Sequence, residues 1–129
     1  MKYELTYESL APKLDSESKV FYAAGCSMTY GQELLGYSRW SSVYHQTPPD
    51  APENYHERRL AAGYPGLVKE KLFPDHVLMN DAMCGGSNHR IVRRTMHHVA
   101  DMLSKGVKPE NIFVLVGFTS MARIEVYDN

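Results

Sequence analysis

The sequence predicts an α/β fold in which helices cover both faces of a parallel sheet, a three-layer α/β/α sandwich. Three short apolar segments that favour strands alternate with two segments of helical periodicity. This alternation is typical of βαβ units, whose strands pair in parallel through right-handed crossovers. The 129 residues, of which 43% are hydrophobic, suffice for one domain with a single core and exclude a disordered chain.

The three predicted strands are short apolar runs. The first covers residues 19–24 and stops at a glycine. The second covers residues 77–80 and is followed by a glycine-rich turn. The third covers residues 112–116, five consecutive apolar residues that end at Gly117. Such an uninterrupted run predicts a strand that is covered on both faces.

The first predicted helix spans residues 64–73. Pro65 is tolerated in a first helical turn, and Pro74 stops the segment. The residues near helical spacing are Leu67, Val68, Lys71 and Leu72.

The second predicted helix begins after Ser87, whose side chain can cap it. It runs to about Lys105, where Gly106 can adopt the left-handed conformation and Pro109 prevents continuation. A period of 3.6 predicts that one face packs against the sheet. The residues of this face are Ile91, Val92, Thr95, Val99, Met102 and Leu103.

The opposite face of this helix carries Arg90, Arg93 and Arg94, beside His97. We interpret these arginines as a solvated face, and the alternative is a surface that binds phosphate or an acidic glycan.

Residues 36–58 contain several proline or turn-like breaks and no sustained periodicity, which predicts a long loop within a single domain of residues 1–129.

The balance of 14 Lys and Arg against 15 Asp and Glu predicts binding neither to nucleic acid nor to anionic membranes. No apolar run is long enough to span a membrane, and the start of the chain does not resemble a secretory signal. We therefore expect a cytoplasmic protein of the producing cell, or a virion protein if a phage encodes it.

The two cysteines, Cys26 and Cys84, are too few for a disulfide scaffold and form no CxxC pair for zinc. We expect their side chains on neighbouring loops. Two thiols are expected rather than a disulfide, because Cys is commonly a small core residue and a reducing compartment is the default. Nothing in the sequence predicts a metal or another cofactor.

Ligand sites of open parallel sheets form outside the carboxyl ends of the strands. Three loops qualify, at residues 25–31, 80–88 and 117–120. The first holds Ser27 between glycines after a buried strand, a context that can expose a hydroxyl among unpaired backbone N–H groups. Taken alone, a serine in such a turn is more often a helix cap than a nucleophile.

Taken together, the motifs of these loops resemble the SGNH (GDSL-like) hydrolase superfamily, in particular a branch common among tailed phages. The segment Gly25-Cys26-Ser27-x-Thr29-x-Gly31 resembles its first motif, and Asn80, Gly85 and Ser87 resemble its second. The further residues that match the branch are Ala82, Asn88, Ile91-Val92-Arg93-Arg94-Thr95 and Thr119-Ser120-Met121-Ala122-Arg123.

This resemblance implies a flavodoxin-like fold of the SGNH type and a serine ester hydrolase. Ser27 stands at the nucleophile position, and the backbone N–H groups of Ser27 and Gly85 would form part of the oxyanion hole. The implied substrate is an acyl or acetyl ester, for example on a glycan, and no cofactor is implied.

The sequence departs from the superfamily in two places. Thr119 stands where the third motif has an Asn that donates to the oxyanion, and Asn88 beside Gly85 is a candidate replacement. The late Asp-x-x-His segment that supplies the base has no counterpart. His89 is a candidate base, its alternative role being an ordinary polar residue at a helix start. Arg123, just beyond the third loop, is a candidate substrate-binding residue.

Two functions therefore stay open. Ser27 and Gly85 favour ester hydrolysis, whereas the missing base favours a structural or binding protein, associated with a virion, that keeps the fold without a complete catalytic set. The matched motifs correspond to the front portion of a complete SGNH enzyme. A sheet that ends just past residues 112–116 should expose an apolar edge, so we expect a homo-oligomer, a component of a larger assembly or a longer protein.

Overall fold

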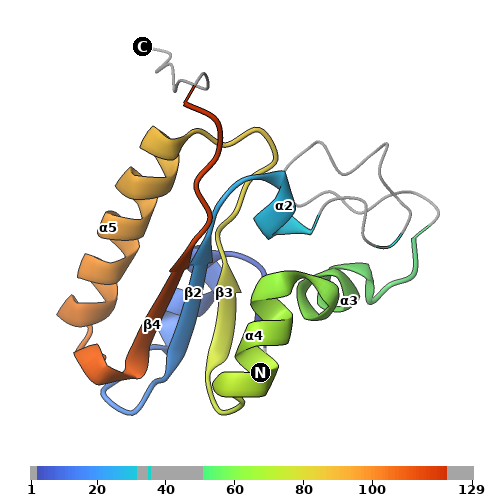
Figure 1. Cartoon of the computed structure of the whole chain (residues 1–129). Helices are drawn as coiled ribbons and strands as arrows, with labels where there is room; N and C mark the ends of the chain where they lie inside the picture. Colours follow the sequence, from blue (N-terminus) through green and yellow to red (C-terminus); the bar gives the residue numbers. More distant parts are fainter. Residues whose placement is uncertain (1–2, 32–34, 36–50, 122–129) are drawn as a thin grey trace.

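The structure of the chain, a computed structural model, describes residues 3–31, 35 and 51–121. These residues form an α/β fold around a four-stranded parallel sheet of order β1-β3-β2-β4 (Figure 1). Among them, no helix has both the length and the apolar character needed to cross a membrane.

The strands are β1 (Tyr3–Glu4), β2 (Val20–Ala24), β3 (Val77–Asn80) and β4 (Ile112–Val116). The helices are α1 (Tyr7–Leu10), α2 (Ser27–Tyr30), α3 (Tyr55–Ala62), α4 (Tyr64–Leu72) and α5 (Asn88–Ser104), and short 3-10 turns lie at Ala11–Lys13 and Pro109–Asn111.

All three predicted strands are present, and each pairs with its neighbours in parallel, which confirms an α/β fold with a parallel sheet. β2 lies between β3 and β4, so that Phe21 is in register with Leu78 on one side and Phe113 on the other. β1 was not predicted, because a strand of two residues is too short to show a periodicity. It extends the sheet beyond β3.

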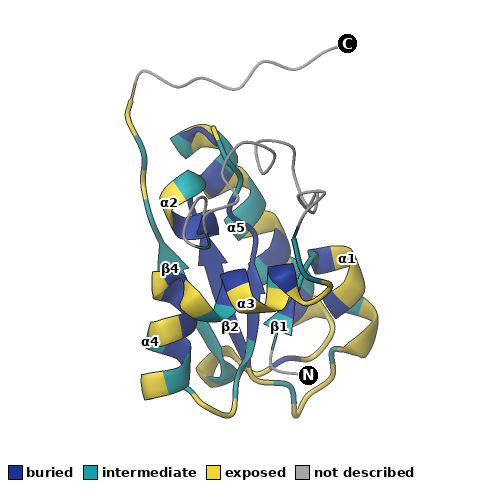
Figure 2. Cartoon of the chain, turned by 90° about the vertical axis from the view of Figure 1, so that its right-hand side faces the viewer, coloured by how far each residue is buried: buried dark blue, intermediate teal, exposed yellow. Residues whose placement is uncertain are grey.

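Strand β2 is the centre of the core because both of its faces are covered. Its five residues are at most 1% exposed. Side chains alternate between the two faces of a strand. Tyr22 therefore belongs to a cluster with Ile91 and Met102 of α5, whereas Phe21 belongs to a second cluster with Leu60 of α3. Buried residues concentrate on β2 and β3 and on the helix sides that meet the sheet (Figure 2).

Helix α5 begins and ends where the sequence predicts. The Ser87 hydroxyl accepts a hydrogen bond from the Arg90 N–H at 3.1 Å and caps the helix. Gly106 follows its last turn with φ of +89°, the left-handed conformation expected there.

The buried face of α5 differs in part from the predicted one. Ile91 and Met102 are buried as expected, but Val92 and Leu103 are each 43% exposed. His98 is only 4% exposed instead. The helix is rotated toward His98 because this imidazole finds polar partners inside the fold, a preference that apolar periodicity does not reveal.

Helix α4 spans the predicted segment but presents another face to the core. Leu67 and Leu72 are at least 60% exposed, whereas Lys69 is fully buried. The cause is a close approach to α3, since a Cβ on Gly66 would lie 2.0 Å from the Leu60 carbonyl oxygen. The buried ammonium is tolerated because it donates to a carboxylate and to a backbone carbonyl.

Helix α3 begins inside the loop predicted for residues 36–58, so the last residues of that segment are helical. Residues 36–50 lie outside the described residues. The helix escaped prediction because its buried face includes Arg59, which interrupts the apolar period. The Arg59 guanidinium lies 3.7 Å from the ring centroid of Tyr30 and donates to the Tyr30 carbonyl.

Strand β4 is the outer strand on one side of the described sheet, where its neighbour is β2. Its five residues are half-buried. Ile112, Val114 and Val116 pack against one core cluster and Phe113 and Leu115 against the other, so that both faces meet the core as predicted. An uninterrupted apolar run indicates a strand but does not show whether the strand lies inside a sheet or at its edge.

Replacement of Phe21 by Ala should lower the free energy of unfolding by about 3–5 kcal/mol, because it removes a buried ring. This ring contacts the rings of Phe73 and Phe113. Urea denaturation followed by circular dichroism measures the loss. Phe118→Ala removes a ring that is 66% exposed and is the matched control, with an expected change below about 0.5 kcal/mol. Equal losses in the two variants would contradict the central position of Phe21.

Candidate functional site

Three loops leave the carboxyl ends of β2, β3 and β4 at the same edge of the sheet (Figure 1). The Met83 N–H donates to the Gly25 carbonyl at 3.1 Å, which ties the loop after β3 to the loop after β2. The Gly117 N–H donates to the Ala24 carbonyl at 2.8 Å, which brings the loop after β4 to the same place. The three segments that resemble hydrolase motifs are therefore neighbours in space.

Thr29 packs the first loop against its surroundings. A Cβ on Gly25 would lie 2.0 Å from Thr29 Oγ1, and a Cβ on Gly117 would lie 2.6 Å from it. The same Oγ1 lies 2.6 Å from the Tyr64 hydroxyl of α4. The Thr29 carbonyl accepts a hydrogen bond from Asn80 Nδ2 at 2.9 Å. Thr29, Asn80 and the two glycines thus hold the loops together.

Among the described residues of this edge, Ser27 and Gly85 offer polar groups that are available to a ligand. Ser27 is the half-buried first residue of α2, and Gly85 lies on the adjacent loop, exposed, with φ of +78°. Glycine adopts this left-handed conformation at little cost. Within the described ranges, neither the Ser27 hydroxyl nor the N–H groups of Ser27 and Gly85 make a hydrogen bond. A hydroxyl and two N–H donors are the groups from which an acyl-transfer site is built.

Asn88 and Thr119 join the start of α5 to the loop after β4. Asn88 Nδ2 donates to the Thr119 carbonyl at 2.9 Å, and the Thr119 N–H donates to Asn88 Oδ1 at 2.7 Å. These two reciprocal hydrogen bonds fix the loop after β4 to the start of α5. The structure therefore gives both residues a positioning role at the edge that holds Ser27.

His89 is the second residue of α5 and is exposed. Arg123 lies outside the described residues.

A buried carboxylate follows β3 directly. Asp81 is 1% exposed, and Arg94 of α5 donates to its two oxygens from Nε and Nη2, each at 2.8 Å. Burial acts to raise the pKa of Asp81, but the hydrogen bonds and the charge of Arg94 outweigh it and lower this pKa. Arg90 Nη1 donates to the Asp81 carbonyl at 3.3 Å. The expectation of a purely solvated arginine face is therefore wrong for Arg90 and Arg94.

Tyr22 and His98 complete this buried network. The Tyr22 hydroxyl donates to Asp81 Oδ2 at 2.9 Å and lies 2.8 Å from His98 Nδ1. Because the hydroxyl has a single proton, His98 Nδ1–H donates to the Tyr22 oxygen, as a neutral imidazole can. Burial lowers the pKa of His98 to about 4, although the Asp81 charge acts in the opposite direction. The Tyr7 ring stacks on the imidazole, with 3.9 Å between the centroids.

The network of Asp81, Arg94, Tyr22 and His98 was not predicted from the sequence. The one available signal was an acidic residue directly after a predicted buried strand, followed by arginines on the next helix. No sequence spacing connects these residues to Tyr22, because the sheet and the helix have to pack before the side chains meet.

The two cysteines are present as thiols, Cys26 buried and Cys84 half-buried. Burial raises the pKa of the Cys84 thiol, while the positive charge of Arg59 acts to lower it. Cys26 also raises the pKa of the Cys84 thiol. This effect agrees with the expectation that the two side chains lie on neighbouring loops.

Comparison with known proteins places the chain in a family. Residues 46–129 match the model of a family of unknown function, DUF6071. The match covers more than half of the chain, which therefore belongs to this family. It includes the loop after β3, α5 and β4, and it begins beyond Ser27. No curated protein and no solved structure matches the chain.

The folding stability should fall as the pH drops from about 6.5 to about 4, by about 1.4 kcal/mol per pH unit. In this window the unfolded chain protonates His98 at its ordinary pKa of 6.5, whereas the folded chain keeps it neutral. The unfolded state then binds more protons, so that acid favours it. Urea denaturation across this pH range measures the slope.

Two variants isolate the contribution of His98. His98→Asn, whose amide can still bond to Tyr22, should flatten the pH dependence. His97→Asn changes the exposed neighbour, whose charge adds less to the lowered pKa of His98 than burial does, and should keep most of the wild-type slope. An unchanged slope in His98→Asn would contradict a buried neutral imidazole.

Proposed function

We propose that this DUF6071 chain is an SGNH-like serine hydrolase of acyl or acetyl esters, built on a three-layer α/β/α sandwich of the flavodoxin-like type. One observation carries the proposal. Ser27 and Gly85 lie on adjacent loops at the carboxyl edge of the parallel sheet, and their hydroxyl and N–H groups are not engaged by the described residues. The order of the three loop motifs supports the same conclusion.

In the proposed reaction Ser27 Oγ attacks the acyl carbonyl carbon and passes its proton to a base. The carbonyl oxygen becomes an oxyanion that accepts hydrogen bonds from the N–H groups of Ser27 and Gly85. The alcohol then leaves with a proton from the base, and the acyl group stays on Ser27. Water attacks this ester in the same way and releases the carboxylic acid.

His89 is the base that we propose, since it is exposed at the start of α5 beside the Gly85 loop. His98 is unsuited because its Nδ1 is engaged by Tyr22. It also lies ten residues beyond the first residue of α5, about 15 Å along the helix. Removing one member of a serine–histidine–aspartate triad leaves only about 10³–10⁴-fold catalysis over water, and the late Asp-x-x-His segment has no counterpart in this sequence. The chain should therefore acylate slowly.

The proposed substrate class is an O-acetylated glycan or a similar surface ester, which the resemblance to phage proteins favours. Small acetyl esters then serve as generic probes, because the proposed chemistry requires only the acyl carbonyl and a leaving alcohol.

A second function, a structural or binding protein that assembles through β4 as part of a virion, is favoured by the edge of the sheet. Five half-buried apolar residues lie on this outer strand. An apolar edge strand of this length is a template for pairing with another chain.

Light scattering after size-exclusion chromatography should show a mass above that of one chain. A single-chain mass at every concentration would contradict assembly through β4.

4-Nitrophenyl acetate should acylate Ser27, with release of 4-nitrophenol and the added mass of one acetyl group. Ser27→Ala should abolish both signals and leave the melting temperature nearly unchanged, because the lost hydroxyl makes no hydrogen bond within the described ranges. Ser104→Ala, at the exposed end of α5, is the matched control and should acylate like the wild type. His89→Asn should slow acylation. Acetylation of the Ser27→Ala variant at the wild-type rate would refute the assignment.

A further inference from the structure

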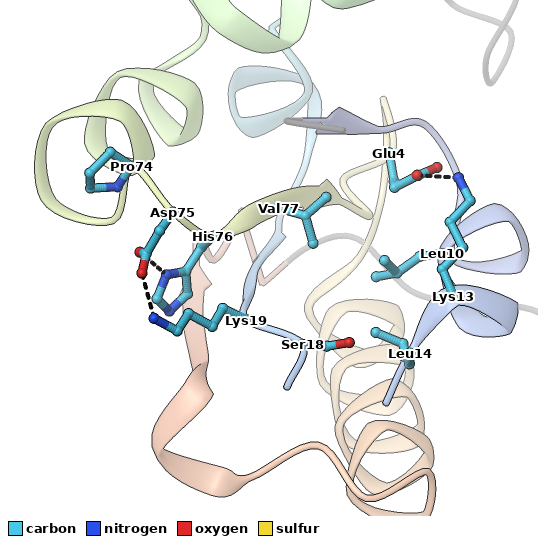
Figure 3. A pocket seen from close by; sticks show the side chains of 10 residues that line it. All are labelled: Glu4, Leu10, Lys13, Leu14, Ser18, Lys19, Pro74, Asp75, His76 and Val77. Carbon is cyan, nitrogen blue, oxygen red and sulfur yellow. Dashed lines mark hydrogen bonds and ion pairs between the residues drawn. The ribbon is translucent and has the colours of Figure 1, made fainter. Parts of the chain in front are cut away.

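The two outer strands of the described sheet differ in how they are protected against pairing with a further strand. β1 has only two residues, and its buried Glu4 forms an ion pair with Lys13. Figure 3 shows this pair beside a cavity of about 470 Å³ at the amino ends of the strands. Short edge strands and charged side chains are the devices that prevent edge pairing. β4, in contrast, has five apolar residues and neither a charge nor a proline, so that the sheet is open to pairing at β4.

Helix α5 has a polar flank, which faces away from β4. Arg94 on this flank donates to Asp81, the residue directly after β3. The Tyr7 hydroxyl of α1 donates to Asp101 on the same flank at 2.7 Å, and α1 contacts β1. Because β3 and β1 lie on the side of β2 opposite to β4, the polar flank is turned toward that side of the sheet.

The other flank of α5 is apolar and faces β4. Asn88, at the start of this flank, is hydrogen-bonded to Thr119 beyond β4. Val99 packs against the same core cluster as alternate residues of β4. Three of the four apolar residues of this flank are 43–69% exposed, so that the described residues leave them largely uncovered. The four residues, which we call the apolar stripe, are Val92, Met96, Val99 and Leu103.

The apolar stripe is complementary to an antiparallel copy of itself. Its residues are separated by four, three and four positions, a spacing that reads the same in both directions and is typical of two packed helices. An antiparallel copy places Val92 of one chain against Leu103 of the other, and Met96 against Val99. A two-fold interface requires this property, because both chains contribute the same patch. The stripe therefore selects a second copy of this chain as its partner.

One two-fold axis serves the stripe and the strand together. The centre of β4 is Val114, which lies at most about 17 Å from Thr119, five residues further. The centre of the stripe, between Met96 and Val99, lies about 14 Å along α5 from Asn88. Because Asn88 and Thr119 are hydrogen-bonded, the two centres lie at about the same level.

The spacing of the strands also fits two packed helices. α5 covers β2 and β4, since Tyr22 and Val114 belong to the cluster that α5 completes. Strands lie about 4.8 Å apart, so that pairing of β4 with its copy sets the two helices two strand spacings apart, about 10 Å. Packed helices lie about 8–10 Å apart. Pairing of the strands thus brings the two stripes into contact.

We propose that this chain forms a two-fold dimer through β4 and the apolar stripe of α5. The two β4 strands pair antiparallel and join the two sheets into one, and the two α5 helices pack against each other on one face of the joined sheet. This inference rests on the assembly through β4 proposed above and deepens it by naming the partner and the second element. It is independent of hydrolysis at Ser27.

Sedimentation equilibrium of the full chain and of two charge variants tests the helix contact. The wild type should form a dimer. Met96→Glu places a charge at the centre of the stripe, on a side chain that is 69% exposed in one chain, and should raise the dissociation constant at least tenfold. Leu72→Glu is the matched control, because Leu72 is 64% exposed on α4, which covers the other face of the sheet. This variant should dimerise like the wild type.

Hydrogen exchange tests the strand contact. The backbone amides of β4 that β2 leaves unpaired should exchange at least tenfold more slowly in the dimer than in the diluted chain. A single-chain mass of the wild type at every concentration would overturn both this inference and assembly through β4. Wild-type dimerisation of Met96→Glu, unprotected β4 amides in the dimer, or an assembly larger than a dimer would overturn the two-fold interface and leave assembly as such standing.

Discussion

The buried carboxylate of Asp81 is the constraint on which much of the architecture depends. An ionised carboxylate with 1% exposure is tolerated only if donors and a cation replace the lost water. Arg94 supplies two hydrogen-bond donors and the positive charge, and the Tyr22 hydroxyl of β2 supplies a further donor. The ion pair of Asp81 and Arg94 therefore fixes α5 to the sheet directly after the end of β3. Removing one partner of such a pair typically costs about 3–5 kcal/mol.

The same constraint accounts for the orientation of α5 and for the state of its buried histidine. Because the hydroxyl proton of Tyr22 is committed to Asp81, the imidazole of His98 has to act as a donor toward Tyr22. The helix consequently buries His98, while Val92 and Leu103 remain partly exposed. The buried face of α5 is therefore the one on which His98 finds a hydrogen-bond partner, and not the one that would bury the most apolar surface.

The two ends of the sheet differ in the chemistry that they present. At the carboxyl end, glycines and a buried asparagine hold the loops so that the groups of Ser27 and Gly85 stay available. At the amino end, lysines and carboxylates surround an apolar hollow. Parallel strands produce this separation, because all loops that leave the strands emerge on one side and all loops that enter them lie on the other.

The sequence by itself determined the three longer strands, the parallel α/β arrangement and the caps of α5, because these follow from local apolar runs, glycines and a capping serine. It also singled out the loops that carry Ser27 and Gly85, since strand ends are visible as the points where apolar runs stop. Only the tertiary structure decided that Lys69 and Arg59 are buried and that Asp81 meets Arg94, Tyr22 and His98. A polar side chain can be buried only where packing brings it a partner, and such partners come from segments that no local pattern connects.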